Sequence, residues 1–121
     1  MPSLLIVDDS RVSRMMIRAR VQVAHPHWTV AEAATGDEAV GLVANAPPDY
    51  VTMDVNMPGL NGFDAAELIR RAVPSVKVVM LTANIQESSH AKAQELGVHL
   101  VQKPITDASI RQVLDHFTAQ P

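Results

Sequence analysis

The 121-residue sequence contains no cysteine, which excludes disulfide bonds and metal sites built on thiolates. No apolar run approaches the ~20 residues that a membrane-spanning helix needs. The opening Met1-Pro2-Ser3 places no basic segment ahead of the short apolar run 4–7, so no signal peptide is predicted. We therefore expect a cytoplasmic protein without membrane insertion.

A net positive charge is also lacking, since the formal net charge is −3. Domains that bind nucleic acid directly are usually basic, so we expect no direct nucleic-acid partner. The five histidines are scattered without the helical H-x-x-x-H spacing of a zinc site. With 47% apolar residues the chain suits one core. We expect a single domain over residues 1–121 with no output domain, unless the chain is excised from a longer protein.

Short β-branched runs alternate with longer helical patterns along the whole chain. Strands are predicted at residues 3–8, 28–33, 49–55, 76–81 and 98–101. Helices are predicted from about residue 11 to 24, 36 to 45, 63 to 72 and 87 to 96, and from 107 onward. Ser10 is a candidate N-cap, Thr35 and Glu38 form a candidate capping box, and Gly97 is a candidate C-cap. This order predicts an α/β fold, (βα)5, with helices on both faces of a parallel sheet.

In the first predicted helix the apolar residues recur at helical spacing and indicate one apolar face. They are Val12, Met15, Met16, Ala19 and Val23. We expect the two methionines, and Met80 of the fourth strand, to pack in the core. The arginines of this helix lie mainly on the other side, where a solvated face is expected.

Four predicted strands end in polar residues of different chemical kinds. The first ends in Asp8-Asp9, the third in Asp54 and the fourth in Thr82, while the fifth runs through Gln102 to Lys103-Pro104. Ligands bind at the carboxyl ends of strands in parallel α/β sheets. The sequence therefore predicts three carboxylates, a hydroxyl and an ammonium group at one edge, which suits a divalent metal ion and a phosphoryl group.

The segments 6–10, 53–59, 81–83 and 103–104 resemble those of the receiver domain of two-component response regulators. The resemblance covers essentially the whole chain, in order and with appropriate spacing. It implies a flavodoxin-like, doubly wound five-stranded sheet of order 2-1-3-4-5. It also implies a stand-alone, phosphorylation-controlled signalling module of a two-component system or phosphorelay, with chemotaxis as one setting that fits.

By that resemblance Asp54 is the phosphoacceptor, which forms an acyl phosphate by attack of its carboxylate on phosphorus. Mg²⁺ is the expected cofactor, because an anionic nucleophile that approaches a phosphoryl group needs charge neutralisation. Asp9, Asp54 and the backbone carbonyl of Asn56 are the expected metal ligands, and Asp8 is expected to act through a water molecule. The alternative is that Asp8 or Asp9 merely caps the first helix or stays solvated.

The same resemblance gives roles to the other strand ends. Lys103 is expected to reach Asp54 and later a phosphoryl oxygen, aimed inward by Pro104, since the Lys-Pro bond of receivers is cis. The Thr82 hydroxyl is expected to bind the phosphoryl group after moving inward. Ala83 stays small so that a phosphodonor can approach, and its N–H can donate to the phosphate.

The chain departs from the family at Leu100. Receivers commonly carry Tyr or Phe three residues before the lysine, and leucine offers neither a ring nor a hydroxyl. Two interpretations stay open. Leu100 takes part in the switch together with Thr82, or it is ordinary strand packing and the signal runs through the loop 82–86.

The expected phosphodonor is a phosphohistidine on a histidine kinase or a histidine phosphotransfer protein, and the output is changed affinity for an unknown downstream protein. Such a domain catalyses its own phosphorylation and dephosphorylation, yet it signals by binding and is not classed as an enzyme. One alternative is a pseudo-receiver that acts by binding alone. A haloacid-dehalogenase-like phosphatase would need D-x-D on the first strand, where Asp8 and Asp9 are adjacent. A flavin binder would need a Ser/Thr-rich phosphate loop and more aromatic residues.

Overall fold

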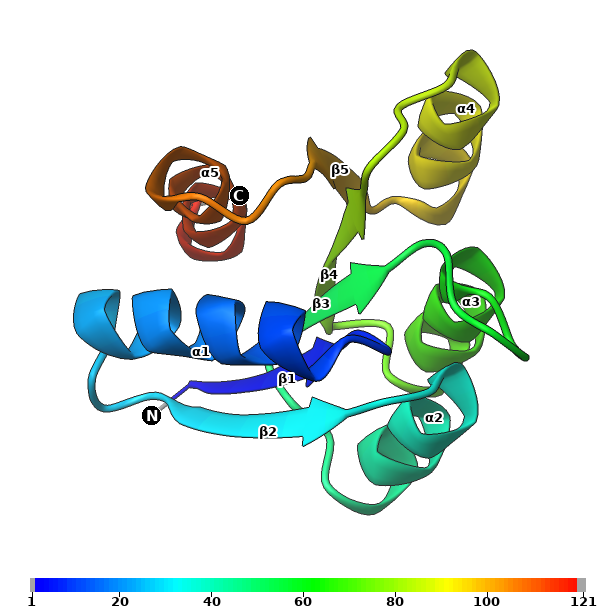
Figure 1. Cartoon of the computed structure of the whole chain (residues 1–121). Helices are drawn as coiled ribbons and strands as arrows, with labels where there is room; N and C mark the ends of the chain where they lie inside the picture. The colour runs from blue at the N-terminus through cyan, green and yellow to red at the C-terminus, as the bar shows by residue number, and fades with distance from the viewer. Residues whose placement is uncertain (1, 120–121) are drawn as a thin grey trace.

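The computed structural model describes residues 2–119, so Met1 and the last two residues of the predicted domain lie outside the described residues. Five parallel strands form one sheet in the order β2-β1-β3-β4-β5, which confirms the predicted fold (Figure 1). The strands are β1 (Ser3–Val7), β2 (Thr29–Ala33), β3 (Tyr50–Asp54), β4 (Lys77–Thr82) and β5 (His99–Gln102). The helices are α1 (Arg11–Ala24), α2 (Gly36–Asn45), α3 (Gly62–Ala72), α4 (Glu87–Leu96) and α5 (Asp107–Thr118).

Each face of the sheet has its own apolar core. Helices α2, α3 and α4 cover one face, and α1 and α5 cover the other (Figure 1). Successive residues of β4 alternate between the two cores, because neighbouring side chains of a strand point to opposite faces. Val78 and Met80 pack on the α2–α4 side, whereas Val79 and Leu81 pack on the α1–α5 side. Because both faces of β4 are buried, its sequence is one continuous apolar run. The expected core position of Met80 is also confirmed.

The helix ends show why the chain changes direction where it does. The Ser10 hydroxyl accepts a hydrogen bond from the Ser13 N–H, and Thr35 accepts one from Glu38. The two-way capping box forms at α5 instead, between Thr106 and Ser109. Gly97 ends α4 at a φ of 70°, a left-handed conformation that favours glycine. None of the helices in residues 2–119 combines the length and apolar character needed to cross a membrane.

Helix α1 packs on the sheet through a face other than the predicted one. Ile17 and Val21 are buried, whereas Met15 is 57% exposed and Val12 and Val23 are exposed more fully. Of the two methionines expected in the core, only Met16 packs partly against it. The helix is apolar on two sides, so helical spacing alone does not identify the buried side.

Two arginines of α1 form ion pairs with β2. Arg14 and Arg18 both bind the carboxylate of Glu32 on β2, with N–O distances of 2.9 Å and 2.7 Å. These arginines therefore line the edge of the sheet, where a solvated face was expected. The opposite, exposed side of α1 carries four apolar residues, namely Val12, Met15, Ala19 and Val23.

Candidate phosphoryl and metal site

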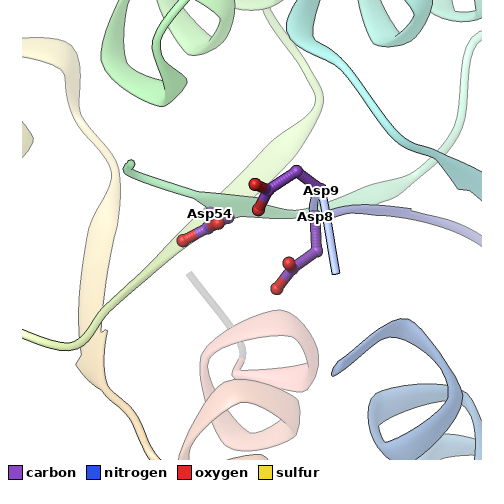
Figure 2. Close-up of side chains that lie close together, drawn as sticks. All are labelled: Asp8, Asp9 and Asp54. Atoms are coloured by element: carbon purple, nitrogen blue, oxygen red, sulfur yellow. The ribbon is translucent and has the colours of Figure 1, made fainter. Parts of the chain in front are cut away.

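Three carboxylates meet where β1 and β3 end (Figure 2). Val7 and Met53 are paired in the parallel register, so the residues that follow them, Asp8 and Asp54, lie side by side. Asp9 extends the group by one position. One carboxylate oxygen from each aspartate lies within 4.8 Å of the others. Parallel pairing of neighbouring strands is therefore what brings together residues that are far apart in the sequence.

The three aspartates differ in exposure and in bonding. Asp8 is only 1% exposed, and its carboxylate accepts hydrogen bonds from the Ser10 N–H at 2.8 Å and from Lys103 Nζ at 3.0 Å. Asp54 is 6% exposed, whereas Asp9 is exposed. Asp8 is thus fixed in place, while Asp9 offers its oxygens to solvent. An incoming cation would meet Asp9 first.

Lys103 supplies positive charge at this edge. Its Nζ lies 3.4 Å from Asp54, so it reaches that carboxylate as expected, and it lies nearer still to Asp8, at 3.0 Å. The Lys103–Pro104 peptide bond is cis. Burial tends to lower the pKa of Lys103, but its bond to Asp8 and the charges of both aspartates outweigh burial and raise that pKa. The lysine therefore stays charged throughout the physiological pH range.

The carboxyl group of Asp54 has a raised pKa. Burial is the main cause that raises its pKa to about 6, and the charge of Asp8 and a side-chain hydrogen bond with Asp9 act in the same direction. Lys103 opposes them through its charge and its hydrogen bond. Like charges that share a site disfavour full ionisation, and a divalent cation would remove that conflict. The electrostatics of the cluster therefore favour a bound cation.

The donor set fits Mg²⁺. Carboxylate oxygens are hard ligands of the kind that Mg²⁺ and Ca²⁺ prefer, and the clustered side chains include no histidine. Asn56, whose carbonyl is the expected third protein ligand, is exposed in the loop just beyond Asp54. The residues that could hold Mg²⁺ are thus Asp9, Asp54 and Asn56, with Asp8 behind them.

Thr82 and Ala83 lie at the end of β4, beside the aspartates. The Thr82 hydroxyl donates to the Asn84 carbonyl at 2.9 Å and accepts from the Asn84 N–H at 3.2 Å, so its own loop holds it. Ala83 is exposed. It lines an open cavity of about 520 Å³ together with Ser13, Met16, Lys103, Pro104 and Ile105. A phosphodonor could approach Lys103 through this cavity.

Leu100 lies on β5 opposite Met80 of β4. It is partly buried and packs against the core on the α2–α4 side of the sheet. This position is consistent with ordinary strand packing.

Gly62 is a site residue that the sequence did not reveal. It begins α3, and a Cβ atom placed on it would lie 2.0 Å from the Asp54 carbonyl oxygen. Its N–H donates to the Val55 carbonyl at 3.0 Å. The glycine thus lets the start of α3 touch the backbone of Asp54, the predicted phosphoacceptor. In the sequence, Gly62 directly follows Asn61, the N-cap of α3, and no local pattern marks its contact with Asp54.

Known proteins share both the sequence pattern and the fold. A family model described as the response regulator receiver domain matches residues 4–115. The chemotaxis protein CheY of Thermotoga maritima is 33% identical over 113 residues, which cover 93% of this chain and 93% of that protein. A solved structure of Vibrio cholerae CheY4 is 28% identical, covers 97% of this chain and 98% of its own, and has a TM-score of 0.86.

Larger proteins also contain a matching segment. A protein-glutamate methylesterase/protein-glutamine glutaminase of Pyrococcus abyssi is 36% identical over 122 residues, which cover 97% of this chain. The chain spans about a third of that protein, since the match covers 33% of its length. Because one model spans nearly the whole chain and relatives of equal length align with it, this protein belongs to the receiver domain family of two-component response regulators.

Proposed function

We propose that this domain accepts a phosphoryl group from a phosphohistidine onto Asp54 and then changes its affinity for a downstream protein. The observation that carries the proposal is the position of the Asp54 carboxylate, which is 6% exposed, 3.4 Å from Lys103 and clustered with Asp8 and Asp9. This arrangement combines an anionic nucleophile with the positive charge and the metal-binding oxygens that phosphoryl transfer needs.

In the transfer step an Asp54 carboxylate oxygen attacks phosphorus. The bond between phosphorus and the donor imidazole nitrogen breaks, and its electron pair returns to that nitrogen. The product is an acyl phosphate on Asp54. Lys103 neutralises charge on a phosphoryl oxygen. Its Nζ is already close to Asp54, the attacking residue, because it lies between the carboxylates of Asp8 and Asp54. Asp9, Asp54 and the Asn56 carbonyl would hold Mg²⁺, which would supply further positive charge to the transferred group.

The switch begins when the phosphoryl group offers a new partner to Thr82. To reach it, the Thr82 hydroxyl gives up its two hydrogen bonds with Asn84, which frees the loop 82–86 to rearrange. The N–H of Ala83 then donates to the phosphate. A loop with two such arrangements is a bistable element that phosphorylation can bias. The same residues would support self-catalysed phosphorylation from small donors and self-catalysed dephosphorylation.

The test is intact mass after incubation with acetyl phosphate, with Mg²⁺ or with a chelator, for the wild type and Asp54→Asn. We expect one phosphoryl group only on the wild type and only with Mg²⁺. A modification retained in Asp54→Asn would show that another residue is the acceptor. No adduct, together with no binding of the phosphoryl mimic beryllofluoride, would instead favour a pseudo-receiver that signals by binding alone.

The ligand assignment has its own test. Asp9→Asn should weaken Mg²⁺ binding more than Asp8→Asn, because Asp9 is the exposed carboxylate and Asp8 is held by Ser10 and Lys103. Metal titration of both variants would measure the difference. Equal losses, or a larger loss for Asp8→Asn, would contradict the assignment.

A further inference from the structure

A second cavity, away from the acidic site, is lined by basic side chains. Its volume is about 240 Å³, and it lies near the amino ends of β4 and β5, whereas the acidic site lies at the carboxyl ends of β1 and β3. The described residues that line it include four basic side chains and no acidic one, namely Arg70, Lys77, His99 and His116. The cavity therefore gathers two permanent cations and two imidazoles, with no carboxylate among its described lining residues.

The two permanent cations are anchored, yet each keeps donor capacity. Arg70 Nη1 donates to the carbonyls of Pro74 and Val76 at 3.2 Å and 2.6 Å. Its Nη2 atom lies near Gly97, at 3.4 Å from the position that a Cβ atom would take there. Lys77 Nζ donates to two carbonyls at the end of α5, at 3.1 Å each, and an ammonium group has three N–H donors. Both side chains are thus fixed in place with N–H groups left for a further acceptor.

The two histidines bring β5 and α5 together. Their rings stack with centroids 3.9 Å apart and planes inclined by 13°. Burial lowers the pKa of His116, and the neighbouring His99 lowers it further, while Asp115 opposes both. Nearly parallel rings hold their in-plane lone pairs in separate planes, so a single metal ion does not suit this pair. A negative ligand suits it, because such a ligand would stabilise a protonated imidazole.

We propose that this cavity binds a small phosphate-bearing anion through Arg70, Lys77, His99 and His116. Guanidinium, ammonium and imidazolium groups form their strongest hydrogen bonds with phosphate and carboxylate oxygens, and several of them converge here. The cavity is smaller than a drug-sized pocket, so the ligand is phosphate, pyrophosphate or a short phosphate ester. Because its anchors come from β4, β5, α3 and α5, the bound anion would tie α5 to the edge of the sheet. This proposal does not depend on phosphorylation of Asp54.

The experiment follows the imidazole Hε1 proton resonances of the full chain during titration with inorganic pyrophosphate. A chelator is present throughout, and potassium chloride keeps the ionic strength constant. We expect saturable shifts for His99 and His116, which line the cavity, and binding that tightens about tenfold as the pH falls through the pKa of His116, because its protonated imidazole adds charge. His90, an exposed histidine on α4 outside the cavity, should not respond. Inorganic phosphate in a parallel titration tests whether one phosphate group suffices.

Matched variants decide the outcome. His99→Gln should weaken pyrophosphate binding about tenfold while intact mass after acetyl phosphate treatment is unchanged, and His90→Gln should bind as the wild type does. Lys77→Gln should also lose binding, with urea unfolding to check that α5 remains docked. Shifts that grow linearly with concentration, or unaltered binding by His99→Gln, would overturn the proposal. Loss of the shifts in Asp54→Asn would assign the anion to the acidic site instead.

Discussion

Gly62 has no side chain, and the acidic site depends on this. A methyl group on it would lie 2.0 Å from the Asp54 carbonyl oxygen and 2.8 Å from the Val55 Cα atom, both of which are backbone atoms that cannot rotate away. We expect Gly62→Ala to lower the free energy of unfolding by about 3 kcal/mol, because α3 must separate from the end of β3. Urea unfolding measures this loss, and intact mass should show slower phosphorylation of Asp54.

The control for this prediction is another helical glycine. Gly41 lies in α2, and a Cβ atom placed on it would meet no atom within 4 Å. Gly41→Ala should therefore raise the free energy of unfolding by about 0.5–1 kcal/mol, because alanine is the better helix former. Similar losses for both variants would mean that helix propensity, and not the contact with Asp54, explains the effect at Gly62.

Thr52 carries a buried polar atom without a partner. Its Oγ1 is the buried side-chain oxygen that forms no hydrogen bond within residues 2–119, and the residue is fully buried. Replacement by valine keeps the branched shape and removes the hydroxyl, so we expect Thr52→Val to raise the free energy of unfolding by about 1 kcal/mol. Urea unfolding is the measurement. As the control, Thr52→Ser keeps the hydroxyl and loses the methyl group, so it should be less stable than the wild type. If Thr52→Val were also less stable than the wild type, the hydroxyl would have a water partner.

At the scale of elements, Glu32 of β2 binds two arginines of α1, and Arg18 also donates to the Val30 carbonyl of β2. Burial tends to raise the pKa of Glu32, but hydrogen bonds and charge from Arg18 and Arg14 outweigh burial and hold that pKa below its ordinary value. A carboxyl group with a lowered pKa in the folded state stabilises the protein above its ordinary pKa. That stabilisation is lost as the pH falls through the lowered value.

Glu32→Gln tests this contribution. We expect the variant to lose about 1 kcal/mol of stability near pH 7, because each arginine keeps only a neutral acceptor. The difference from the wild type should shrink as the pH falls through the lowered pKa of Glu32, because the charge is then lost. Urea unfolding near pH 7 and at successively lower pH values measures it. If the stability difference between Glu32→Gln and the wild type stayed the same at lower pH, the packing of the side chain, and not its charge, would explain the loss of stability.

The elements themselves were predictable because their signals are local. Strand periodicity, the caps at Ser10 and Thr35 and the C-cap at Gly97 depend on residues within one turn of each other. The orientation of α1 was not predictable, because the ion pairs of α1 involve Glu32, which lies on β2 and follows later in the chain. The stacking of His99 on His116 likewise joins residues that no local pattern relates.

At the scale of the whole molecule, the acidic site was predictable because the fold is regular. A parallel sheet collects the residues after its strands at one edge, so five strands sufficed to place Asp8, Asp54 and Lys103 together. The bonding within that edge was not predictable. That Lys103 lies nearer Asp8 than Asp54, and that Thr82 bonds to its own loop, depends on distances of a few tenths of an ångström.

The stability of the whole domain should depend on Mg²⁺ and on pH together. Because the pKa of Asp54 is raised to about 6, the folded metal-free protein binds a proton more readily than the unfolded chain does. Its stability from this group therefore falls as the pH rises from about 4 to about 6. Mg²⁺ binds the ionised site, so we expect saturating Mg²⁺ to raise the melting temperature more near pH 7.5 than near pH 5.

Thermal unfolding with Mg²⁺ and with a chelator measures this coupling. Asp54→Asn is the matched variant, because it removes the charge and keeps the shape. It should melt above the wild type in the chelator near pH 7.5 and should lose most of the Mg²⁺ effect. An equal Mg²⁺ effect at both pH values would show that the ion binds away from Asp54.

The order of the strands along the chain also sets the order in which a ribosome delivers the parts of the acidic site. Strands β1 and β3 are neighbours in the sheet and emerge early, whereas Lys103 follows 95 positions after Asp8. Chains are synthesised at about 5–20 residues per second, so for several seconds the three carboxylates exist without their lysine. During that interval the aspartates have no Lys103 to offset their charge. The positive charge of the acidic site is thus the last of these parts to be added during synthesis.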